Sequence, residues 1–185
     1  MHYTSQLQKI GRMDTDISSN NFLGVFPADK IPVQDMKRSN FFCCIANTDA
    51  SDKPGQHWVA FICLKGKRIF FDSYGKHPSY YNSFWADFDS WTASKMEIQQ
   101  EDSDVCGDYC IFFLKFASSN ADFSLSKFYR YFDSDGKEEN DNLVFQICHS
   151  LYPRILNSVG HDIDGDGHYD PVLKNSCNQG CKSRR

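Results

Sequence analysis

Three runs of apolar, β-branched and aromatic residues lie close together, at residues 41–47, 57–64 and 67–73. Runs of this length and composition, bounded by turn-forming residues, are typical of β-strands. The second and third runs are separated only by Lys65 and Gly66. A two-residue connection that contains glycine predicts a hairpin. The chain is therefore expected to begin a sheet here.

Helical spacing of apolar residues appears further along the chain. Residues 106–117 are apolar almost throughout and repeat at helical intervals, which predicts a largely buried helix. Asp102, Ser103 or Asp104 could cap its first turn. Residues 142–152 place their apolar side chains on one helical face and predict a second helix, which the following proline ends.

The remaining segments carry weaker patterns. Residues 5–10 are compatible with a short helix, and residues 20–32 have the glycine and proline content of an ordered loop. Residues 95–99 form another candidate strand, and residues 100–104 a polar loop before the buried helix. No internal repeat is present.

Length, charge and cysteine content narrow the class of protein. A chain of 185 residues suits one domain, and a net charge of −4 with a pI near 5.8 lacks the basic field of non-specific nucleic-acid binders. Neither a secretory signal nor an apolar run long enough to span a membrane is found, so we expect a soluble, non-secreted protein. Of the eight cysteines, those within apolar strands predict buried thiols: Cys43, Cys44 and Cys63.

The hairpin predicts that a histidine and an aspartate share one face of the sheet. If the strands pair directly at the turn, His57 stands opposite Tyr74, and Asp72 stands opposite Val59. His57 and Asp72 are then diagonal neighbours with Cβ atoms about 7–8 Å apart, unless a bulge intervenes. A carboxylate fixes one tautomer of such a histidine and leaves the other ring nitrogen free to take a proton from a nucleophile.

Cys106 is the candidate nucleophile because it begins the buried helix, where free N–H groups and the helix dipole favour a thiolate. Gly107 leaves room for a substrate carbonyl. The backbone N–H of Cys106 and a side-chain amide of Gln99 or Gln100 could stabilise an oxyanion. The charge of Asp104 would oppose the thiolate unless this residue caps the helix or points away.

Each of these residues alone is ordinary. A cysteine at a helix start, a histidine that opens a strand and an aspartate that ends one are most often structural. Spacing alone leaves that interpretation open, but the combination favours a Cys-His-Asp enzyme.

Five segments, in this order along the chain, match one known pattern: NFLG at 21–24, CCIANT at 43–48, GQHWVAF at 55–61, FFDSYG at 70–75 and IQQEDSDVCGDYCIFFL at 98–114. In these segments the chain resembles the adenovirus-type, adenain-like endopeptidases, which are distant relatives of the SUMO-specific and other ubiquitin-like-specific proteases. The resemblance covers about residues 20–118 and continues more loosely to about residue 155.

The resemblance implies an α+β fold, a papain-like cysteine protease with circularly permuted order, in which a mixed β-sheet packs on a central helix that carries the nucleophile. Its domain would span residues 1–155, with residues 156–185 as a tail of unknown role. His57 would be the general base, Asp72 its orienting carboxylate and Cys106 the nucleophile.

The oxyanion glutamine of the family maps to Gln99 by the adenovirus pattern and to Gln100 by the SUMO-protease spacing, and Gln99 is preferred. The matched positions also suggest three substrate-binding residues: Gly24, Trp58 and Gly107.

The implied activity is that of a cysteine endopeptidase that cleaves after small residues such as glycine, through an acyl-enzyme. Its expected role is the maturation of capsid or core precursor proteins of a virus or a virus-like transposon. Two alternatives stay open: an isopeptidase that removes SUMO or ubiquitin-like modifiers, and a catalytically inactive binding module.

Cofactors and partners follow from the same resemblance. The adenovirus enzyme is basic and uses DNA and a disulfide-linked capsid-derived peptide as cofactors. This chain is acidic, and the segment just before Gln99 offers no cysteine for that link. We therefore expect no required cofactor and no DNA or membrane partner, while a peptide activator of another kind stays open. The expected enzyme is a monomer in the host nucleus or cytoplasm, or packaged in virions.

The end of the chain contains two incomplete metal-binding patterns. Residues 162–167 begin like an EF-hand loop, but Leu173 stands where a bidentate glutamate is needed. A zinc site would require a spacing that fits no standard pattern, with ligands His161, His168, Cys177 and Cys181. A flexible acidic turn is the favoured interpretation, and no metal site is predicted.

Overall fold

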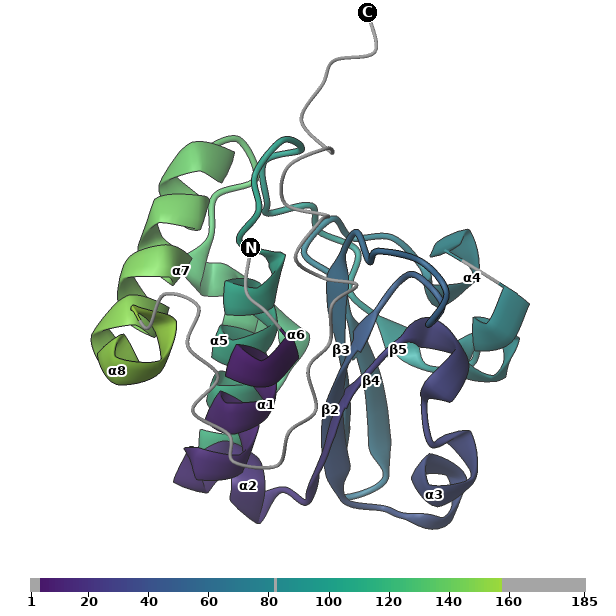
Figure 1. Ribbon diagram of the computed structural model, residues 1–185. Helices are drawn as coiled ribbons and strands as arrows, with labels where there is room; N and C mark the ends of the chain where they lie inside the picture. Colours follow the sequence, from purple (N-terminus) through teal and green to yellow (C-terminus); the bar gives the residue numbers. More distant parts are fainter. Residues whose placement is uncertain (1–3, 82, 158–185) are drawn as a thin grey trace, which may run out of the picture.

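The structure, a computed structural model, describes residues 4–81 and 83–157 and is built around one mixed sheet (Figure 1). Its strand order is β1-β2-β3-β4-β5. The three middle strands pair antiparallel, whereas the two edge strands pair parallel to their neighbours. The strands are β1 (Phe22–Phe26), β2 (Phe42–Asn47), β3 (Trp58–Leu64), β4 (Lys67–Phe71) and β5 (Thr92–Ala93).

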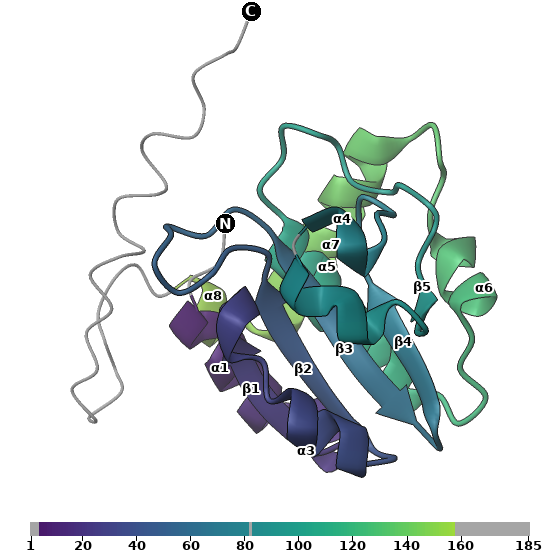
Figure 2. The ribbon, with the colours of Figure 1, turned by 90° about the vertical axis from the view of Figure 1, so that its right-hand side faces the viewer.

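Helices cover both faces of the sheet, as the two views in Figures 1 and 2 show. The larger layer packs in one core with the sheet and contains α1 (Thr4–Met13), α2 (Thr15–Ser19), α5 (Cys106–Ser119), α6 (Leu125–Phe128), α7 (Lys137–Leu151) and α8 (Pro153–Leu156), with η3 (Tyr129–Tyr131) beside it. The opposite face carries a second core beneath η1 (Ala28–Lys30), α3 (Val33–Arg38), α4 (Pro78–Tyr81) and η2 (Ser83–Phe88). A mixed sheet between two helical layers explains why the central strands contain few polar residues.

Strand β2 is buried along its whole length because both of its faces meet a core. Cys43 and Ile45 belong to the core under α5, and Phe42 and Cys44 to the core on the opposite face. The predicted burial of the strand thiols is confirmed, and Cys63 of β3 is likewise buried and free.

The predicted hairpin is confirmed in its register. Leu64 pairs with Lys67, and the two turn residues Lys65 and Gly66 have φ values of 51° and 80°. Positive φ at both central positions is the geometry of a type I′ turn, whose twist matches that of paired strands.

This register fixes which residues meet at one end of the β3–β4 hairpin. The last pair of the ladder joins Ala60 to Phe71, so His57 lies just before β3 and Asp72 just after β4. His57 and Asp72 therefore lie close together at the end of the hairpin where β3 begins and β4 ends.

The prediction of a loop over residues 20–32 was wrong, because this segment contains β1. The register of β1 against β2 shifts between Phe22 and Gly24, and Gly24 has a φ of +139°. A strand that carries such an irregularity has no clean alternation of apolar and polar residues, and its sequence resembles that of a loop.

The predicted strand over residues 95–99 was also wrong. Strand β5 precedes it at Thr92–Ala93, and the segment that follows lies outside any regular element. Ile98 and Gln99 instead donate their backbone N–H groups to the carbonyl oxygen of Ser73, at 2.9 and 3.2 Å.

The predicted buried helix is confirmed as α5, which begins at Cys106. The expectation that Asp102, Ser103 or Asp104 caps it was wrong: Val105 is the N-cap residue and makes no side-chain capping hydrogen bond. The hydroxyl of Ser103 is used elsewhere, as an acceptor from the side chain of Gln99.

The predicted helix over residues 142–152 corresponds to α7, which begins earlier, at Lys137, and ends at Leu151. Its first turn is polar, with Glu138 and Glu139, and therefore lacks the apolar periodicity on which the prediction relied. Acidic residues there complement the positive end of the helix dipole. The calcium-like and zinc-like patterns lie outside the described residues.

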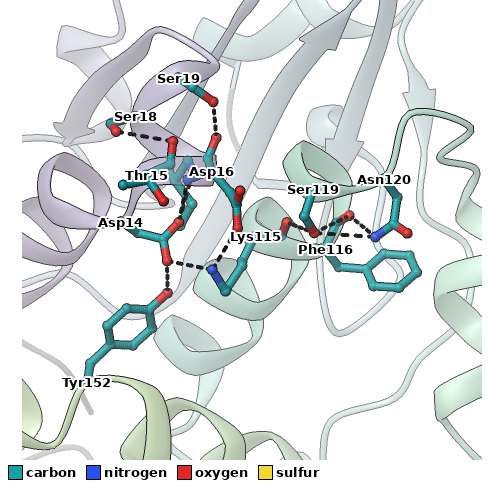
Figure 3. Close-up of polar contacts among 11 residues, drawn as sticks. Asp14, Thr15, Asp16, Ser18, Ser19, Lys115, Phe116, Ser119, Asn120 and Tyr152 are labelled. Atoms are coloured by element: carbon teal, nitrogen blue, oxygen red, sulfur yellow. Dashed lines mark hydrogen bonds and ion pairs between the residues drawn. The ribbon is translucent and has the colours of Figure 1, made fainter.

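A polar cluster ties the N-terminal helices to α5 (Figure 3). Asp14 caps α2 by accepting from the N–H groups of Asp16 and Ile17, each at 3.0 Å. Its second oxygen accepts from Lys115 of α5 at 2.8 Å and from the hydroxyl of Tyr152 at 2.5 Å. Asp14 thus links α2, α5 and the start of α8 through one carboxylate.

Replacement of Asp14 should weaken the whole fold more than replacement of its neighbour. Asp14→Ala removes a helix cap and leaves Lys115 and Tyr152 without this acceptor, so we expect a loss of about 3 kcal/mol in the free energy of unfolding. Asp16→Ala removes only a half-exposed ion pair with Lys115 and should cost less than about 1 kcal/mol. Urea unfolding of both variants measures the difference, and equal losses would contradict a central role for Asp14.

Candidate active site

The imidazole of His57 and the carboxylate of Asp72 form a close buried pair at the end of the hairpin where β3 begins and β4 ends. The distance from His57 Nε2 to Asp72 Oδ1 is 2.6 Å. His57 is 7% exposed and Asp72 is fully buried. Because Nε2 is taken by the carboxylate, Nδ1 is the ring nitrogen left for another partner.

Four donors surround the Asp72 carboxylate. Beside His57, the backbone N–H of Tyr74 donates to Oδ1 at 3.1 Å. The backbone N–H of Lys76 and the hydroxyl of Tyr81 donate to Oδ2, at 2.8 and 2.7 Å. A buried carboxylate with this many donors is held in one orientation.

The chain wraps around Asp72 in a tight turn. Gly75 has a φ of +66° and returns its N–H to the carbonyl of Asp72 at 3.0 Å. A Cβ at Gly75 would lie 2.9 Å from the backbone of Met96, so glycine is required here. Ser94 holds the backbone of Asp72 from the other side, accepting from its N–H and donating to its carbonyl, each at 2.8 Å.

Two tyrosine rings enclose the imidazole. Tyr74 stacks on His57 with ring centroids 4.5 Å apart, and the Tyr81 centroid lies 5.8 Å away. The hairpin register predicted Tyr74 opposite His57. Tyr81 lies in α4, outside that register, and the sequence pattern gave no sign of its role.

Cys106 reaches this pair from the helical layer. It is the first residue of α5 and is 2% exposed, and it lies close enough to the His57 ring to help raise the pKa of that imidazole. The structure therefore brings together His57, Asp72 and Cys106, the three residues that the sequence singled out.

The charge of His57 follows from its partners. Burial alone disfavours the imidazolium, but hydrogen bonds to Asp72 and Cys106 and the negative charge on both outweigh burial and raise the pKa of His57 to about 9. In general, an imidazolium beside a cysteine favours the thiolate form of that cysteine.

Other thiols lack such a partner. Burial raises the pKa of Cys43 to about 12, and it also raises the pKa values of Cys44, Cys110 and Cys148 well above the usual range. These four groups remain protonated near neutral pH and are poor nucleophiles.

The two candidate oxyanion glutamines lie in different surroundings. The side chain of Gln99 is fully buried: its Oε1 accepts from the Ser73 hydroxyl at 2.6 Å, and its Nε2 donates to the carbonyl and hydroxyl oxygens of Ser103, each at 3.0 Å. Gln100 is exposed. The Gln99 amide nitrogen thus already donates to Ser103 within the protein, whereas the Gln100 side chain is open to solvent.

The three residues suggested for substrate binding are not all close to the triad. Gly107 is buried directly after Cys106. Trp58 follows His57 and is 3% exposed, against a cavity of about 140 Å³ that Gly55 and Asn47 also line. Gly24 lies in β1, on the far side of β2 from β3, and a Cβ there would meet Phe26 and Gln8.

The chain is similar to a protease of ASFV. A crystal structure of the selenomethionine form of the ASFV pS273R protease matches with 23% sequence identity and a TM-score of 0.37. The match covers 57% of this chain and 43% of the ASFV protease, so the chain spans less than half of that protein. No known family model and no curated protein matches the chain.

Two features are absent from residues 4–81 and 83–157, the part of the chain that the structure describes. No helix in these ranges is both long and apolar enough to cross a membrane. Nor do these ranges contain a group of three or more His, Cys, Asp or Glu side chains arranged to hold a metal ion.

The raised pKa of His57 should be directly measurable. An NMR titration of the His57 ring should give a value near 9 in the wild-type protein and a much lower value in Asp72→Asn, where burial is no longer opposed by a carboxylate. Because the folded pKa exceeds the usual value of 6.5, the contribution to stability is complete below pH 6.5 and is lost as the pH rises through 9. Asp89→Asn, which removes the partner of the exposed His77, should leave the His57 titration unchanged. A wild-type value near 6.5 would contradict the assigned geometry.

Proposed function

We propose that the protein is a cysteine endopeptidase. The observation that carries the proposal is the contact of Cys106, at the start of a helix, with a histidine whose other nitrogen is held by a buried carboxylate. This arrangement supplies a nucleophile, a base and an orienting group in the relation that acyl transfer needs.

The reaction follows from these roles. His57 takes the thiol proton of Cys106, and the thiolate attacks the peptide carbonyl carbon to form a C–S bond. His57 then gives its proton to the departing amine as the C–N bond breaks. In the second half, His57 takes a proton from water, whose oxygen displaces the Cys106 sulfur and releases the acid.

We assign the oxyanion donors to the backbone N–H of Cys106 and the side chain of Gln100. The sequence favoured Gln99 narrowly, but the amide nitrogen of Gln99 donates to two oxygens of Ser103, and its side chain is fully buried. A donor can stabilise a developing charge only if it is free to point at it. Gln99 instead supports the loop that presents Gln100.

Narrow access to the nucleophile supports cleavage after small residues. Cys106 is 2% exposed, and the ring of Tyr74 covers His57. A large side chain beside the scissile carbonyl would have to displace these groups, whereas glycine would not. Maturation of viral or transposon capsid precursors is the role that the sequence resemblance adds to this chemistry.

An isopeptidase acting on SUMO or ubiquitin-like conjugates is the second candidate. Such a substrate also presents glycine at the cleaved bond, so the same narrow access favours it. A catalytically inactive module is disfavoured, because the buried carboxylate of Asp72, held by three other donors, serves to orient His57.

Cys106→Ala should abolish peptidase activity while leaving the free energy of unfolding nearly unchanged, since it removes one sulfur atom and no backbone hydrogen bond. Incubation of wild-type protein with a Gly-Gly-type peptide library and with SUMO and ubiquitin conjugates gives the activity and the substrate class together. Cys110→Ala, on the next turn of α5, is the matched control and should retain the activity. Full activity in Cys106→Ala would refute the assignment.

The two glutamines should differ in kinetic signature. Gln100→Ala should lower kcat by about 100-fold with little change in thermal stability, as expected for loss of one oxyanion donor. Gln99→Ala leaves Ser73 and Ser103 without buried partners and should lower the melting temperature as well. If only Gln99→Ala lowered kcat, the assignment of Gln100 would be incorrect.

A further inference from the structure

The loop that carries both glutamines is held by α7, a helix that contributes nothing to the triad. Asp141 of α7 accepts the backbone N–H of Gln100 at its Oδ2, at 3.3 Å. Its Oδ1 accepts from the hydroxyl of Tyr109 at 2.8 Å. One side chain thus joins the loop to α5.

Asn140, the residue before Asp141, holds the same loop at Ile98. Asn140 donates from Nδ2 to the carbonyl of Ile98 at 3.1 Å and to that of Asp133 at 2.6 Å, and its Oδ1 accepts from the N–H of Asp133 at 3.1 Å. Asn140 and Asp141 are 4% and 8% exposed. Buried polar side chains require such partners, so the backbone on both sides of Gln99 is fixed from α7.

The sheet holds the loop from the opposite side. The carbonyl of Ser73, next to Asp72, accepts from the N–H groups of Ile98 and Gln99. The loop is therefore held between the turn that carries the triad aspartate and the helix that carries Asp141. Among these attachments, the bond from Gln100 N–H to Asp141 acts on the residue to which we assign the oxyanion donor.

We propose that Asp141 is a positioning residue for the reaction, which holds the backbone of Gln100 so that its side-chain amide meets the developing oxyanion. This proposal rests on the proposed function and extends it to α7. Asp141 touches no reacting atom, so its effect should fall on the turnover step and leave the Cys106–His57 pair unaltered. A misplacement of about 1 Å in a catalytic group can cost about 100-fold in rate.

The hydrogen-bond pattern predicts which substitution preserves the role. The Tyr109 hydroxyl has one proton and two acceptors in reach, Asp141 Oδ1 at 2.8 Å and the carbonyl of Ile98 at 3.0 Å. With asparagine at position 141, the amide N–H₂ would donate to the Tyr109 oxygen, and Tyr109 would donate to Ile98. The asparagine oxygen would remain free to accept from Gln100, so Asp141→Asn should keep the loop in place.

The test compares Asp141→Ala, Asp141→Asn and Glu138→Ala by two measurements each. Glu138→Ala removes an exposed carboxylate from the same helix and controls for the change in charge. The first measurement is kcat and KM for a peptide amide that ends in Gly-Gly before an aminocoumarin leaving group. The second is the rate at which iodoacetamide alkylates Cys106, a reaction that forms no oxyanion and needs no glutamine.

We expect Asp141→Ala to lower kcat by about 10- to 100-fold, with KM changed less than about 3-fold and the alkylation rate unchanged. Asp141→Asn and Glu138→Ala should stay within about 3-fold of wild type. Unchanged kcat in Asp141→Ala, or equal losses in kcat and alkylation rate, would overturn the proposal. Should Asp141→Ala fail to fold, Asp141→Ser, whose hydroxyl is too short to reach Gln100, replaces it in the comparison.

The outcome also separates this proposal from the proposed function. If Cys106 is not the nucleophile, Cys106→Ala retains activity on the same peptide, whatever Asp141 does. If the peptidase assignment holds and Asp141 is merely structural, Asp141→Ala lowers the melting temperature without lowering kcat at a temperature where the variant is folded.

Discussion

The buried carboxylate of Asp72 is the constraint on which the rest of the site depends. A fully buried negative charge is tolerated only when donors replace the water that it has lost. Asp72 obtains them from His57, from the N–H groups of the turn that follows it, and from Tyr81 of α4. The path of the chain after β4 is therefore dictated by the need to surround one charge, and the orientation of His57 is a result of the same requirement.

Cys106, the proposed nucleophile, comes from a different layer, so the two layers must be held in register. Packing of α5 on the sheet supplies most of this, through one shared apolar core. Polar ties add direction: Asp14 joins α5 to α2 through Lys115, and Asp141 joins α5 to the glutamine loop through Tyr109. Hydrogen bonds prefer a defined distance and angle. The buried polar contacts therefore restrict how α5 can lie on the sheet.

Local patterns predicted the parts of the site that depend on local geometry. The hairpin register required only the turn and strand composition, and it placed His57 and Asp72 at one edge. The start of α5 at Cys106 followed from helical spacing. Strand β1 was missed because Gly24 interrupts its alternation, and Tyr81 and Asp141 because their contacts join segments that share no periodic pattern. The capping prediction failed for the same reason, since Ser103 bonds to Gln99 in the loop and not to the first turn of α5.

The choice between the two glutamines shows how burial can separate roles that sequence leaves equivalent. Gln99 and Gln100 are adjacent and chemically identical, and the spacing of either residue to Cys106 is compatible with an oxyanion glutamine. Gln99 is fully buried and bonds both to Ser73, the residue after Asp72, and to Ser103, which precedes α5. It thereby connects the two layers directly and fixes the loop. Gln100 is held through its backbone N–H by Asp141, and its side chain is exposed. The Gln100 side chain is therefore the one that we assign to the oxyanion.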